Sequence, residues 1–294
     1  TGKETAPGQI TGTSLKNIYR VCDQRDSFKI FGVIGNPVYK SMGYIIHNRA
    51  FKEVKSTNIY IPFLVDNLEK FFKEFSSYFE GLSVTMPFKE DIMVLMDDVE
   101  ETAKRIGSVN TVVRDENGWK GYNTDYTGAL EALEKHVDLK GKKVLIIGAG
   151  GTAKAIGYGV YEKGAKITVT YNKNKEKGLQ LARELKAKVV NIKNAGEEEI
   201  DVLINCSPVG MSPNQGETPI SSRYLRNGMV VFDSVYNPLE TRLIREAKEV
   251  GCVTISGIEL FVNQAVAQLD LWTGQKVSTN LMRDVVVKGL KDSI

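Results

Sequence analysis

A short apolar run that leads directly into a glycine-rich turn constrains the fold of this chain more than any other stretch. Residues 144–147 are four consecutive apolar residues, short enough to form a fully buried parallel strand. The turn fills residues 148–153, a helical pattern then continues to Lys163, and residues 167–170 form a second strand pattern. A glycine-rich turn between a strand and a helix is the context in which this motif binds a dinucleotide.

Small residues of the turn each have a physical role in such a site. Gly148 permits the tight turn, Gly150 leaves room for a pyrophosphate against bare backbone, and Ala153 lets the helix pack closely on the strand. The first N–H groups of the helix then point at the phosphates. The alternative is an ordinary strand-to-helix turn whose glycines serve packing alone. The predicted cofactor-binding residues of the turn are Gly148, Ala149, Gly150, Gly151, Thr152 and Ala153.

The end of the second strand indicates which dinucleotide binds. An NAD site usually carries an acidic residue about 20 residues after the glycines. This chain has Asn172, Lys173, Asn174 and Lys175 there instead. A carboxylate would repel a 2′-phosphate, whereas a lysine attracts one, so we predict NADP, with NAD as the alternative cofactor. These lysines, together with Lys177, could instead simply solvate a surface loop.

Composition argues against several other classes of function. The net charge of +3 is too small to indicate binding to nucleic acid or to a membrane surface. Three scattered cysteines fit a reducing compartment better than a disulfide framework, and no apolar run approaches the roughly 18 residues of a membrane helix. Two histidines without a cysteine cluster argue against a zinc site. We expect a protein of the cytoplasm, or of the plastid in a plant, that uses no metal.

Strand and helix patterns alternate on both sides of the glycine-rich turn, which predicts an α/β fold. The 294 residues are enough for two domains. In the first half we expect strands at residues 28–35, 58–65, 81–85 and 111–113, and one helix over residues 89–106. The predicted organisation is a leader (1–25), a parallel-sheet substrate-binding domain (26–126 with 265–294) and a Rossmann-type NADP-binding domain (127–264), with a cleft between the domains.

Several polar segments carry groups suited to a polyhydroxy acid and its cofactor. They lie at residues 35–41, 83–89, 107–111, 121–125, 205–211, 233–238 and 256–264. With these segments in this order and at this spacing, the chain resembles the shikimate dehydrogenase family over about residues 28–294. The resemblance implies that the chain reduces 3-dehydroshikimate to shikimate with NADPH, a step of the chorismate pathway to aromatic amino acids. The family's chemistry needs no metal.

The resemblance also implies roles for individual residues. Lys89 and Asp125 correspond to the catalytic pair. Ser207, Ser234 and Gly257 would lie against the cofactor, the last two near its nicotinamide end. The implied substrate ligands are Ser41, Gly43, Thr85, Lys89, Asn110, Asp125, Tyr236 and Gln264.

Physical chemistry supports the roles of the polar residues. Hydride addition to a ketone builds negative charge on its oxygen, and protonated Lys89 would donate a proton there. Asp125 would hold the ammonium group and favour its charged form, while Ser41 suits the substrate carboxylate and Asn110 a ring hydroxyl. Alternatively, Lys89 is a solvated lysine that opens a helix, and Asp125 is a helix N-cap. We interpret His47 as a structural helix residue rather than a catalyst.

The chain departs from the family in the first loop, where the usual Ser-Lys-Ser-Pro is replaced by Ser41-Met42-Gly43-Tyr44. One hydroxyl is lost, and the glycine opens space next to the ring carbon that carries the carboxylate. Quinate has a hydroxyl at that carbon, so we hypothesise dual or quinate-leaning activity, although Thr85 is the shikimate-type residue. Lys173 replaces the usual arginine, and lysine lacks the planar fork that grips phosphate, which could weaken the preference for NADP.

Other functions stay open at this point. A catalytically silent relative would bind NADP and a cyclohexane acid as a sensor, and a dehydrogenase could act on another small hydroxy acid. Residues 6–11 resemble the C-terminal end of type I dehydroquinases. We therefore expect the chain to be the dehydrogenase half of a plant-type bifunctional polypeptide.

Overall fold

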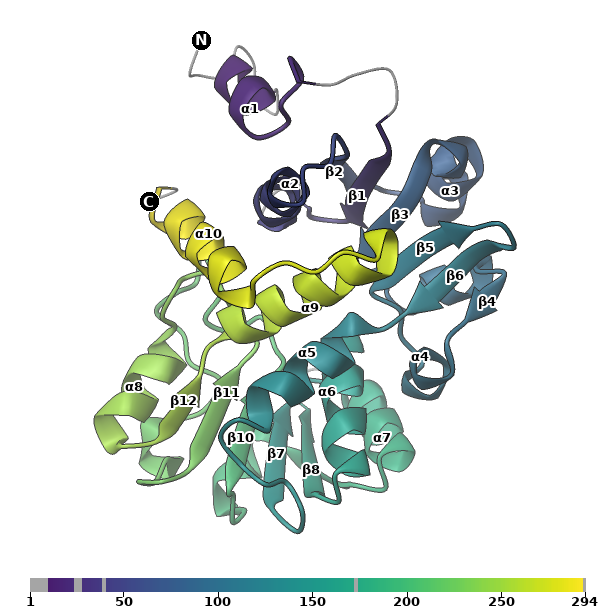
Figure 1. The fold of residues 1–294 in the computed structure, drawn as a ribbon. Helices are drawn as coiled ribbons and strands as arrows, with labels where there is room; N and C mark the ends of the chain where they lie inside the picture. Colours follow the sequence, from purple (N-terminus) through teal and green to yellow (C-terminus); the bar gives the residue numbers. More distant parts are fainter. Residues whose placement is uncertain (1–9, 24–27, 39–40, 172–173, 293–294) are drawn as a thin grey trace. The chain divides into compact units, whose positions relative to one another are not determined.

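The computed structural model describes residues 10–23, 28–38, 41–171 and 174–292, which fall into two compact units. The first unit takes the described residues within 1–105, 109–122 and 265–293, and the second takes those within 106–108 and 123–264. Each unit is built on one sheet of six strands (Figure 1). Among the described residues, no helix is both long and apolar enough to span a membrane.

The sheet of the first unit mixes parallel and antiparallel strands. Its order is β2-β1-β3-β5-β6-β4, in which β2, β1 and β3 run parallel and β5 runs antiparallel to both of its neighbours. The predicted α/β class is confirmed, but a β5–β6 hairpin interrupts the expected parallel order, because Gly118 (φ +119°) lets the chain reverse directly after β5. The strands are β1 (Ile30–Gly35), β2 (Ile59–Leu64), β3 (Phe79–Val84), β4 (Asp98–Val99), β5 (Thr111–Asp115) and β6 (Gly118–Tyr122).

Successive side chains along each strand of this sheet point to its two opposite faces. On one face, Ile34 and Leu82 pack in a cluster with Phe72. On the other face, Gly81 approaches the indole of Trp272 so closely that a Cβ there would lie 2.3 Å from Nε1. The helices of this unit are α1 (Gly12–Asn17), α2 (Gly43–Glu53), α3 (Leu68–Phe75), η1 (Ser76–Tyr78), η2 (Asp91–Leu95), α4 (Glu101–Ile106), α10 (Thr279–Asp292) and the second half of α9 (Gly257–Thr273).

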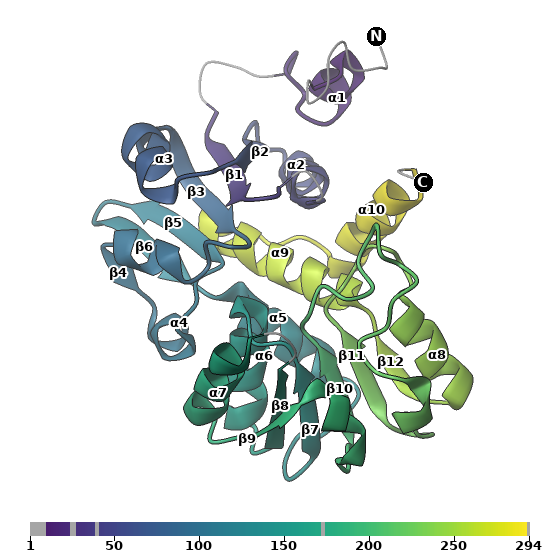
Figure 2. The same cartoon turned by 180° about the vertical axis from the view of Figure 1, so that it is seen from behind.

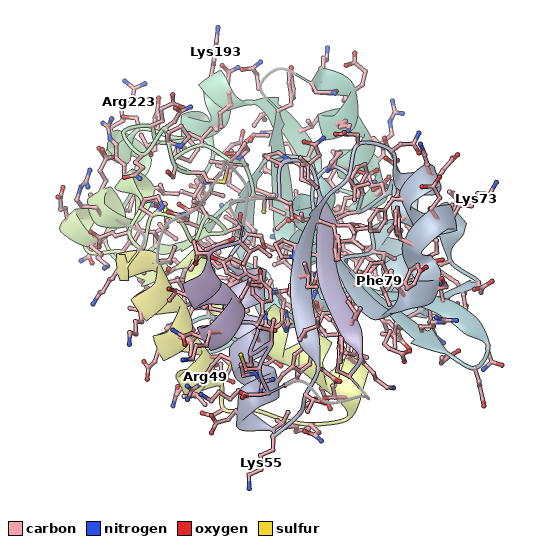
Figure 3. All side chains as sticks on the ribbon, turned by 90° about the horizontal axis from the view of Figure 1, so that it is seen from above. Arg49, Lys55, Lys73, Phe79, Lys193 and Arg223 are labelled. Atoms are coloured by element: carbon pink, nitrogen blue, oxygen red, sulfur yellow. The ribbon has the colours of Figure 1, made fainter. Side chains whose placement is uncertain are left out.

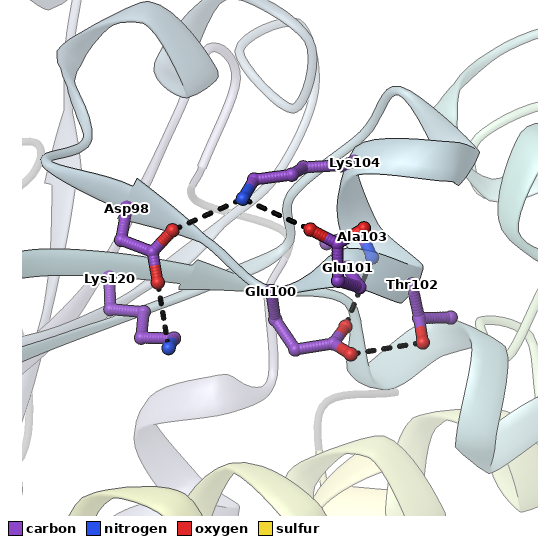
Figure 4. Close-up of polar contacts among 7 residues, drawn as sticks. All are labelled: Asp98, Glu100, Glu101, Thr102, Ala103, Lys104 and Lys120. Carbon is purple, nitrogen blue, oxygen red and sulfur yellow. Dashed lines mark hydrogen bonds and ion pairs between the residues drawn. The ribbon is translucent and has the colours of Figure 1, made fainter.

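The prediction of one helix over residues 89–106 is wrong. This segment forms a turn, the 3-10 helix η2, strand β4 and helix α4. Before α4, the Glu100 carboxylate accepts hydrogen bonds from the Ala103 amide (3.1 Å) and the Thr102 hydroxyl (3.0 Å), so a new helix begins there (Figure 4). Residues 98–99 are not helical because they pair with β6, and this tertiary contact outweighs the helical pattern of the sequence.

Exposed ion pairs surround the start of α4. Lys104 binds Asp98 (3.2 Å) and Glu101 (3.3 Å), and Lys120 binds the other Asp98 oxygen at 2.7 Å (Figure 4). Hydrogen bonds from Lys120 and then from Lys104 lower the pKa of Asp98 to about 2. Because three of these side chains are exposed and Lys120 is half-buried, these pairs add little to stability.

Long charged side chains lie at the surface of the protein, whereas aromatic side chains are found in its core. The labelled Lys55, Lys73 and Lys193 extend from the ribbon into solvent (Figure 3). Phe79, at the start of β3, is buried, and its ring meets the ring of Phe63 edge-on at 5.1 Å. The core of the first unit is therefore partly aromatic.

The second unit has a parallel, doubly wound sheet of order β12-β11-β10-β7-β8-β9. The chain starts in the middle, at β7, winds outwards to β9, and then returns to β10 on the other side of β7. This order reverses between β7 and β10, the position at which open α/β sheets bind ligands. The strands are β7 (Lys143–Ile147), β8 (Lys166–Tyr171), β9 (Lys188–Asn191), β10 (Val202–Asn205), β11 (Val230–Asp233) and β12 (Val253–Ile255).

Two apolar clusters cover the faces of this sheet. One includes Ile146 and Val169 of the sheet with residues of α5, α6 and α7, and the other includes Leu145 and Leu203 with residues of α8 and η3. The view from behind shows α6 and α7 together beside β8 (Figure 2). The helices are α5 (Thr124–Leu133), α6 (Gly151–Glu162), α7 (Lys175–Glu184), η3 (Ile192–Glu197), η4 (Ser222–Tyr224), α8 (Arg242–Val250) and the first half of α9.

Part of the predicted leader contacts the first unit. Tyr19 is buried and stacks on Tyr44, with 6.3 Å between ring centroids. Arg20 donates a hydrogen bond to the Ser56 carbonyl oxygen at 2.8 Å. Burial raises the pKa of the Tyr19 hydroxyl to about 12. Most of the dehydroquinase-like stretch, residues 6–9, lies outside the described residues.

Candidate active site

The glycine-rich turn of the second unit lies at the reversal point of its sheet. Gly148 follows β7 directly and adopts φ +112°, a conformation that favours glycine. A Cβ at this residue would lie 3.0 Å from the carbonyl carbon and oxygen of Cys206, which follows β10. The ends of the two central strands therefore approach each other with no room for a side chain between them.

Helix α6 begins at this turn with its N-terminus unblocked. Its N-cap is Gly150, which provides no side-chain hydrogen bond to the first N–H groups of the helix. A Cβ at Gly150 would meet no atom within 4 Å, so the space beside the backbone is open. Ala153, in contrast, is fully buried against the sheet. An open, uncapped N-terminus of a long helix is suited to phosphate groups.

A pocket of about 250 Å³ opens beside this turn. The buried hydroxyl of Thr170, which lines it, has no hydrogen-bond partner among the described residues, so a polar ligand would satisfy an unpaired group. These features fit a dinucleotide. The pocket is lined by Ile147, Gly148, Ala149, Gly150, Thr170, Tyr171, Asn174, Lys177, Ile192, Ser207, Val209 and Pro219.

The lysine that lines the pocket differs from the lysines predicted to bind the cofactor. Lys177 lines it, whereas Lys175 is exposed and does not. Asn174 is the N-cap of α7, and its side chain accepts a hydrogen bond from the Lys177 amide at 2.9 Å. The pattern Asn-x-x-Lys at a helix start could have indicated this residue from the sequence. Asn172 and Lys173, also predicted to bind the cofactor, lie outside the described residues.

The predicted cofactor residues Ser207, Ser234 and Gly257 lie together. The Asn205 side-chain oxygen accepts hydrogen bonds from the Ser207 amide (3.0 Å) and hydroxyl (2.7 Å). The Asn205 carbonyl oxygen accepts one from the Ser234 amide at 2.9 Å. A Cβ at Gly257 would lie 2.7 Å from the Ser234 carbonyl oxygen, so α9 begins directly against this loop.

Asp233, to which the sequence analysis gave no role of its own, joins these loops through hydrogen bonds. Its fully buried carboxylate accepts hydrogen bonds from the Asn205 side chain (2.9 Å), the Val235 amide (3.0 Å) and the Thr241 hydroxyl (2.6 Å). Burial raises the pKa of this carboxyl to about 6, although the three hydrogen bonds act in the opposite direction. An aspartate at the end of a buried strand is the sequence signal that could have found it.

Three predicted substrate ligands belong to the second unit. Asp125 is buried in the first turn of α5, where a helix N-terminus favours a carboxylate. It is not the N-cap, because Asn123 caps the helix by accepting from the Tyr126 amide at 3.2 Å. Gln264 packs against α5, since its backbone nitrogen lies 2.9 Å from where a Cβ at Gly128 would be.

The same unit places Tyr236 next to Gln264. The Tyr236 ring stacks on Phe261, with 4.3 Å between centroids and 20° between the planes. The Gln264 side chain donates to the Phe261 carbonyl oxygen at 2.8 Å. Tyr236 and Gln264 therefore both contact Phe261 of α9.

The other predicted substrate residues belong to the first unit, where backbone hydrogen bonds join them. The Val109 amide donates to the Lys89 carbonyl oxygen (2.7 Å), and the Val84 amide to the Asn110 carbonyl oxygen (2.8 Å). Thr85 follows β3, and its amide donates to Ile34 at 3.0 Å. Lys89 lies in the turn before η2 and does not open an α-helix.

Ser41 and Gly43 lie at the start of α2. The Ser41 hydroxyl accepts a hydrogen bond from the Gly43 amide at 3.2 Å, and the N-cap of the helix, Met42, provides no side-chain hydrogen bond. A Cβ at Gly43 would lie 3.1 Å from the Tyr60 hydroxyl oxygen. The space that the glycine was expected to open towards a ligand is therefore bounded by Tyr60 in that direction.

His47, on α2, has the features of a structural residue. It is buried and stacks on Tyr60 at 4.4 Å between ring centroids. Burial lowers its pKa to about 3, so the imidazole is neutral. In the part of the chain that the structure describes, no group of three or more His, Cys, Asp or Glu side chains could hold a metal ion.

The pKa of Asp233 leads to a prediction about stability. The folded protein binds this proton more tightly than the unfolded chain does, because the pKa rises from 3.8 to about 6. The contribution of Asp233 to stability is therefore complete below about pH 4 and is lost as the pH rises through about 6. Asp233→Asn keeps the acceptor oxygen and can donate to Thr241, but it cannot titrate.

We expect the free energy of unfolding of Asp233→Asn, relative to that of the unmodified protein, to rise by on the order of 2–3 kcal/mol between pH 4 and pH 7. Urea denaturation across this range measures it. Asp138→Asn, at an exposed position, is the control and should show no such trend. A relative stability independent of pH would contradict the prediction.

Comparisons with known proteins agree with this geometry. Three family models match the chain: the shikimate dehydrogenase substrate binding domain (residues 33–112), shikimate/quinate 5-dehydrogenase (130–222) and the shikimate 5′-dehydrogenase C-terminal domain (257–287). A shikimate dehydrogenase (NADP(+)) of Methanosarcina acetivorans is 40% identical over 90% of this chain and 99% of its own length.

A plant protein is equally similar. The chloroplastic bifunctional 3-dehydroquinate dehydratase/shikimate dehydrogenase of Arabidopsis thaliana is 40% identical over 97% of this chain, which spans about half (51%) of the plant protein. A solved structure of shikimate 5-dehydrogenase from Thermus thermophilus in complex with NADP(H) and shikimate has a TM-score of 0.81 at 32% identity, and the match covers 89% of this chain and 100% of that one. The resemblance identified from the sequence is confirmed: the chain belongs to the shikimate dehydrogenase family.

Proposed function

We propose that this chain is an NADP-dependent dehydrogenase that interconverts 3-dehydroshikimate and shikimate. The observation that carries the cofactor part is the open, uncapped N-terminus of α6 at the reversal point of the sheet, next to a pocket that contains Lys177. Relatives of similar length are named shikimate dehydrogenase (NADP(+)), and a related structure contains NADP(H) and shikimate. The bound nicotinamide would accept or supply the hydride, and the chain's residues handle the substrate and its proton.

The first unit would hold the acid. The Ser41 hydroxyl and the N-terminus of α2 suit a carboxylate, because the hydroxyl hydrogen can be donated and a helix N-terminus favours negative charge. Thr85 and Asn110, whose backbones are held at the ends of β3 and β5, would contact the ring hydroxyls. Their fixed positions would penalise a substrate that lacks the matching hydroxyl.

Lys89 and Asp125 would manage the proton. The Lys89 ammonium would protonate the oxygen on which charge develops during reduction and take the proton back during oxidation. Asp125, a carboxylate at the N-terminus of α5, would orient that ammonium group. Tyr236 and Gln264 would complete the substrate site, and Ser207, Ser234 and Gly257 the cofactor site.

The assignment of the two units to substrate and to cofactor is part of the proposal, as is fusion to a dehydroquinase domain. The fusion is supported by the plant relative, of which this chain spans about half. That relative is named chloroplastic. A location in the plastid, or in the cytoplasm, stays a prediction.

Replacement of Lys89 tests the enzymatic proposal. Lys89→Ala should lower kcat for shikimate oxidation by about 10²–10⁴-fold, the usual effect of losing a general acid or base. NADP affinity, measured by fluorescence titration, should not change. Lys29→Ala, which removes only an exposed ion pair with Glu80, is the control. If the unmodified protein bound NADP but turned over neither shikimate nor quinate, a non-catalytic sensor would be favoured instead.

Two neighbouring lysines test the choice of cofactor. Lys177→Ala should raise KM for NADP by about tenfold or more, because a hydrogen bond to a charged group is lost, and should leave KM for NAD unchanged. Lys175→Ala removes an exposed lysine outside the pocket and should change neither value. A preference for NAD in the unmodified protein would overturn the assignment of NADP.

Quinate dehydrogenase, or a dual enzyme, is the second candidate function. It is favoured by Gly43, at which the chain lacks the hydroxyl usual in the family. A Cβ at Gly43 would lie close to Tyr60 and Ser41, so the extra room for a quinate hydroxyl would have to lie on another side of the glycine backbone.

Steady-state kinetics with both acids decides between the candidates. We expect measurable turnover of quinate, and we expect Gly43→Ser to raise the ratio of kcat/KM for shikimate to that for quinate by about tenfold, because the serine side chain takes up room beside the backbone that only the extra hydroxyl of quinate needs. Asn117→Ser, at an exposed turn, is the control. Undetectable turnover of quinate by the unmodified protein would reject this candidate.

A further inference from the structure

A buried chain of hydrogen bonds crosses the first unit between α2, the sheet and α9. The Tyr60 hydroxyl donates to the Ser83 hydroxyl (2.7 Å), and Ser83 donates to the side-chain oxygen of Gln268 (2.9 Å). His47 Nε2 meets the same Gln268 oxygen at 3.0 Å. All four side chains are almost completely buried. We name this set, together with Thr111, the amide network.

The direction of each hydrogen bond in the amide network follows from what each atom can do. The Gln268 side-chain nitrogen lies 3.3 Å from the Asn110 carbonyl oxygen, which can only accept. The nitrogen therefore faces Asn110, and the Gln268 oxygen faces His47 and Ser83. Both of those groups must then donate to it, so His47 carries its proton on Nε2.

The second hydrogen of the Gln268 nitrogen goes to Thr111. The Thr111 hydroxyl oxygen accepts it at 3.0 Å, so its own single hydrogen is left for another acceptor. That acceptor is the side-chain oxygen of Asn110, at 2.8 Å. The Asn110 amide is thereby oriented with its oxygen towards Thr111 and its NH₂ group turned away from the network.

His47 stays neutral well below neutral pH, so the orientation of the Gln268 amide does not change with pH in that range. Burial lowers its pKa to about 3, and the hydrogen bond to Gln268 only partly offsets that shift. The ring is held between Tyr60 and Trp272, with centroids at 4.4 Å and 5.0 Å. Gln268 and Trp272 are one helical turn apart on α9, so one face of this helix fixes both the ring and the amide.

We infer that Gln268 and Thr111 are positioning residues that present Asn110 to the substrate as a hydrogen-bond donor. The substrate group that meets Asn110 must then accept through a lone pair, as a ring hydroxyl or carbonyl oxygen can and an ammonium group cannot. This inference rests on the proposed function, because Asn110 contacts substrate only there. Beyond the proposed function, it specifies which way the Asn110 amide faces and names Gln268 and Thr111 as the residues that orient it.

Thr111 offers a matched pair of variants. Thr111→Val keeps the shape but removes the hydroxyl, so the Asn110 amide loses the bond that orients it. KM for shikimate should rise by about tenfold, while KM for NADP should change by less than about twofold. Thr111→Ser keeps the hydroxyl and should restore KM for shikimate to within about threefold of the unmodified value. Equal behaviour of the two variants, or equal changes in both KM values, would overturn the inference.

Gln268 provides an independent test through pH. In Gln268→Glu, the protonated acid can donate one hydrogen bond towards Asn110 or Thr111, whereas the ionised form cannot donate at all. KM for shikimate in this variant should therefore rise with pH, relative to that of the unmodified enzyme. Gln268→Met, which cannot donate at any pH, should have a raised KM for shikimate with no added pH dependence.

Controls separate this inference from the proposed function. Gln275→Met, on the exposed chain after α9, should leave both KM values unchanged. If the unmodified protein did not oxidise shikimate, the proposed function would fail first. If it did so and Gln268→Met and Gln268→Glu shared one pH profile, the proposed function would stand and the inference would fail. Should the Gln268 variants not fold, which circular dichroism would detect, the Thr111 pair decides.

Discussion

The close approach of two strand ends in the second unit is the constraint on which its site depends. Gly148 and Cys206 follow β7 and β10, and their backbones leave no room for a Cβ between them. The same strands flank the reversal point of the sheet, so the contact brings the turn before α6 next to the loop that carries Ser207. A larger residue at position 148 would separate the loop from the turn and would also be strained at φ +112°.

Both units stabilise their site loops with buried polar side chains. In the second unit, Asp233 joins the loops after β10 and β11 through three hydrogen bonds. In the first, Gln268 joins β3, β5 and α2 through four hydrogen bonds that use its oxygen and its nitrogen fully. Such groups are costly to bury without partners, so they stabilise one arrangement of the loops over others. The two cases differ in charge: Gln268 is neutral at every pH, whereas Asp233 titrates.

Local patterns in the sequence predicted the elements that local forces control. The turn at residues 148–153 and the helix after it need only the nearby chain, and both are present. The helix predicted over residues 89–106 failed because β4 pairs with β6, which is distant in the sequence. Lys177 was not among the residues predicted to bind the cofactor, because its place at the pocket depends on where α7 begins, at the N-cap Asn174. Gln268 gave no signal, since a glutamine in an apolar helix reads as solvent-exposed.

The sequence by itself determined the α/β class, the glycine-rich turn between strand and helix, and the family, because these depend on residue order and on spacing along one chain. Only the tertiary structure decided which way the Asn110 amide faces, that Tyr60 lies against Gly43, and that Asp233 is buried where it binds the ends of β10 and β11. These features depend on side chains from strands and helices far apart in the sequence. Their donors, acceptors and burial are set only when those elements pack together.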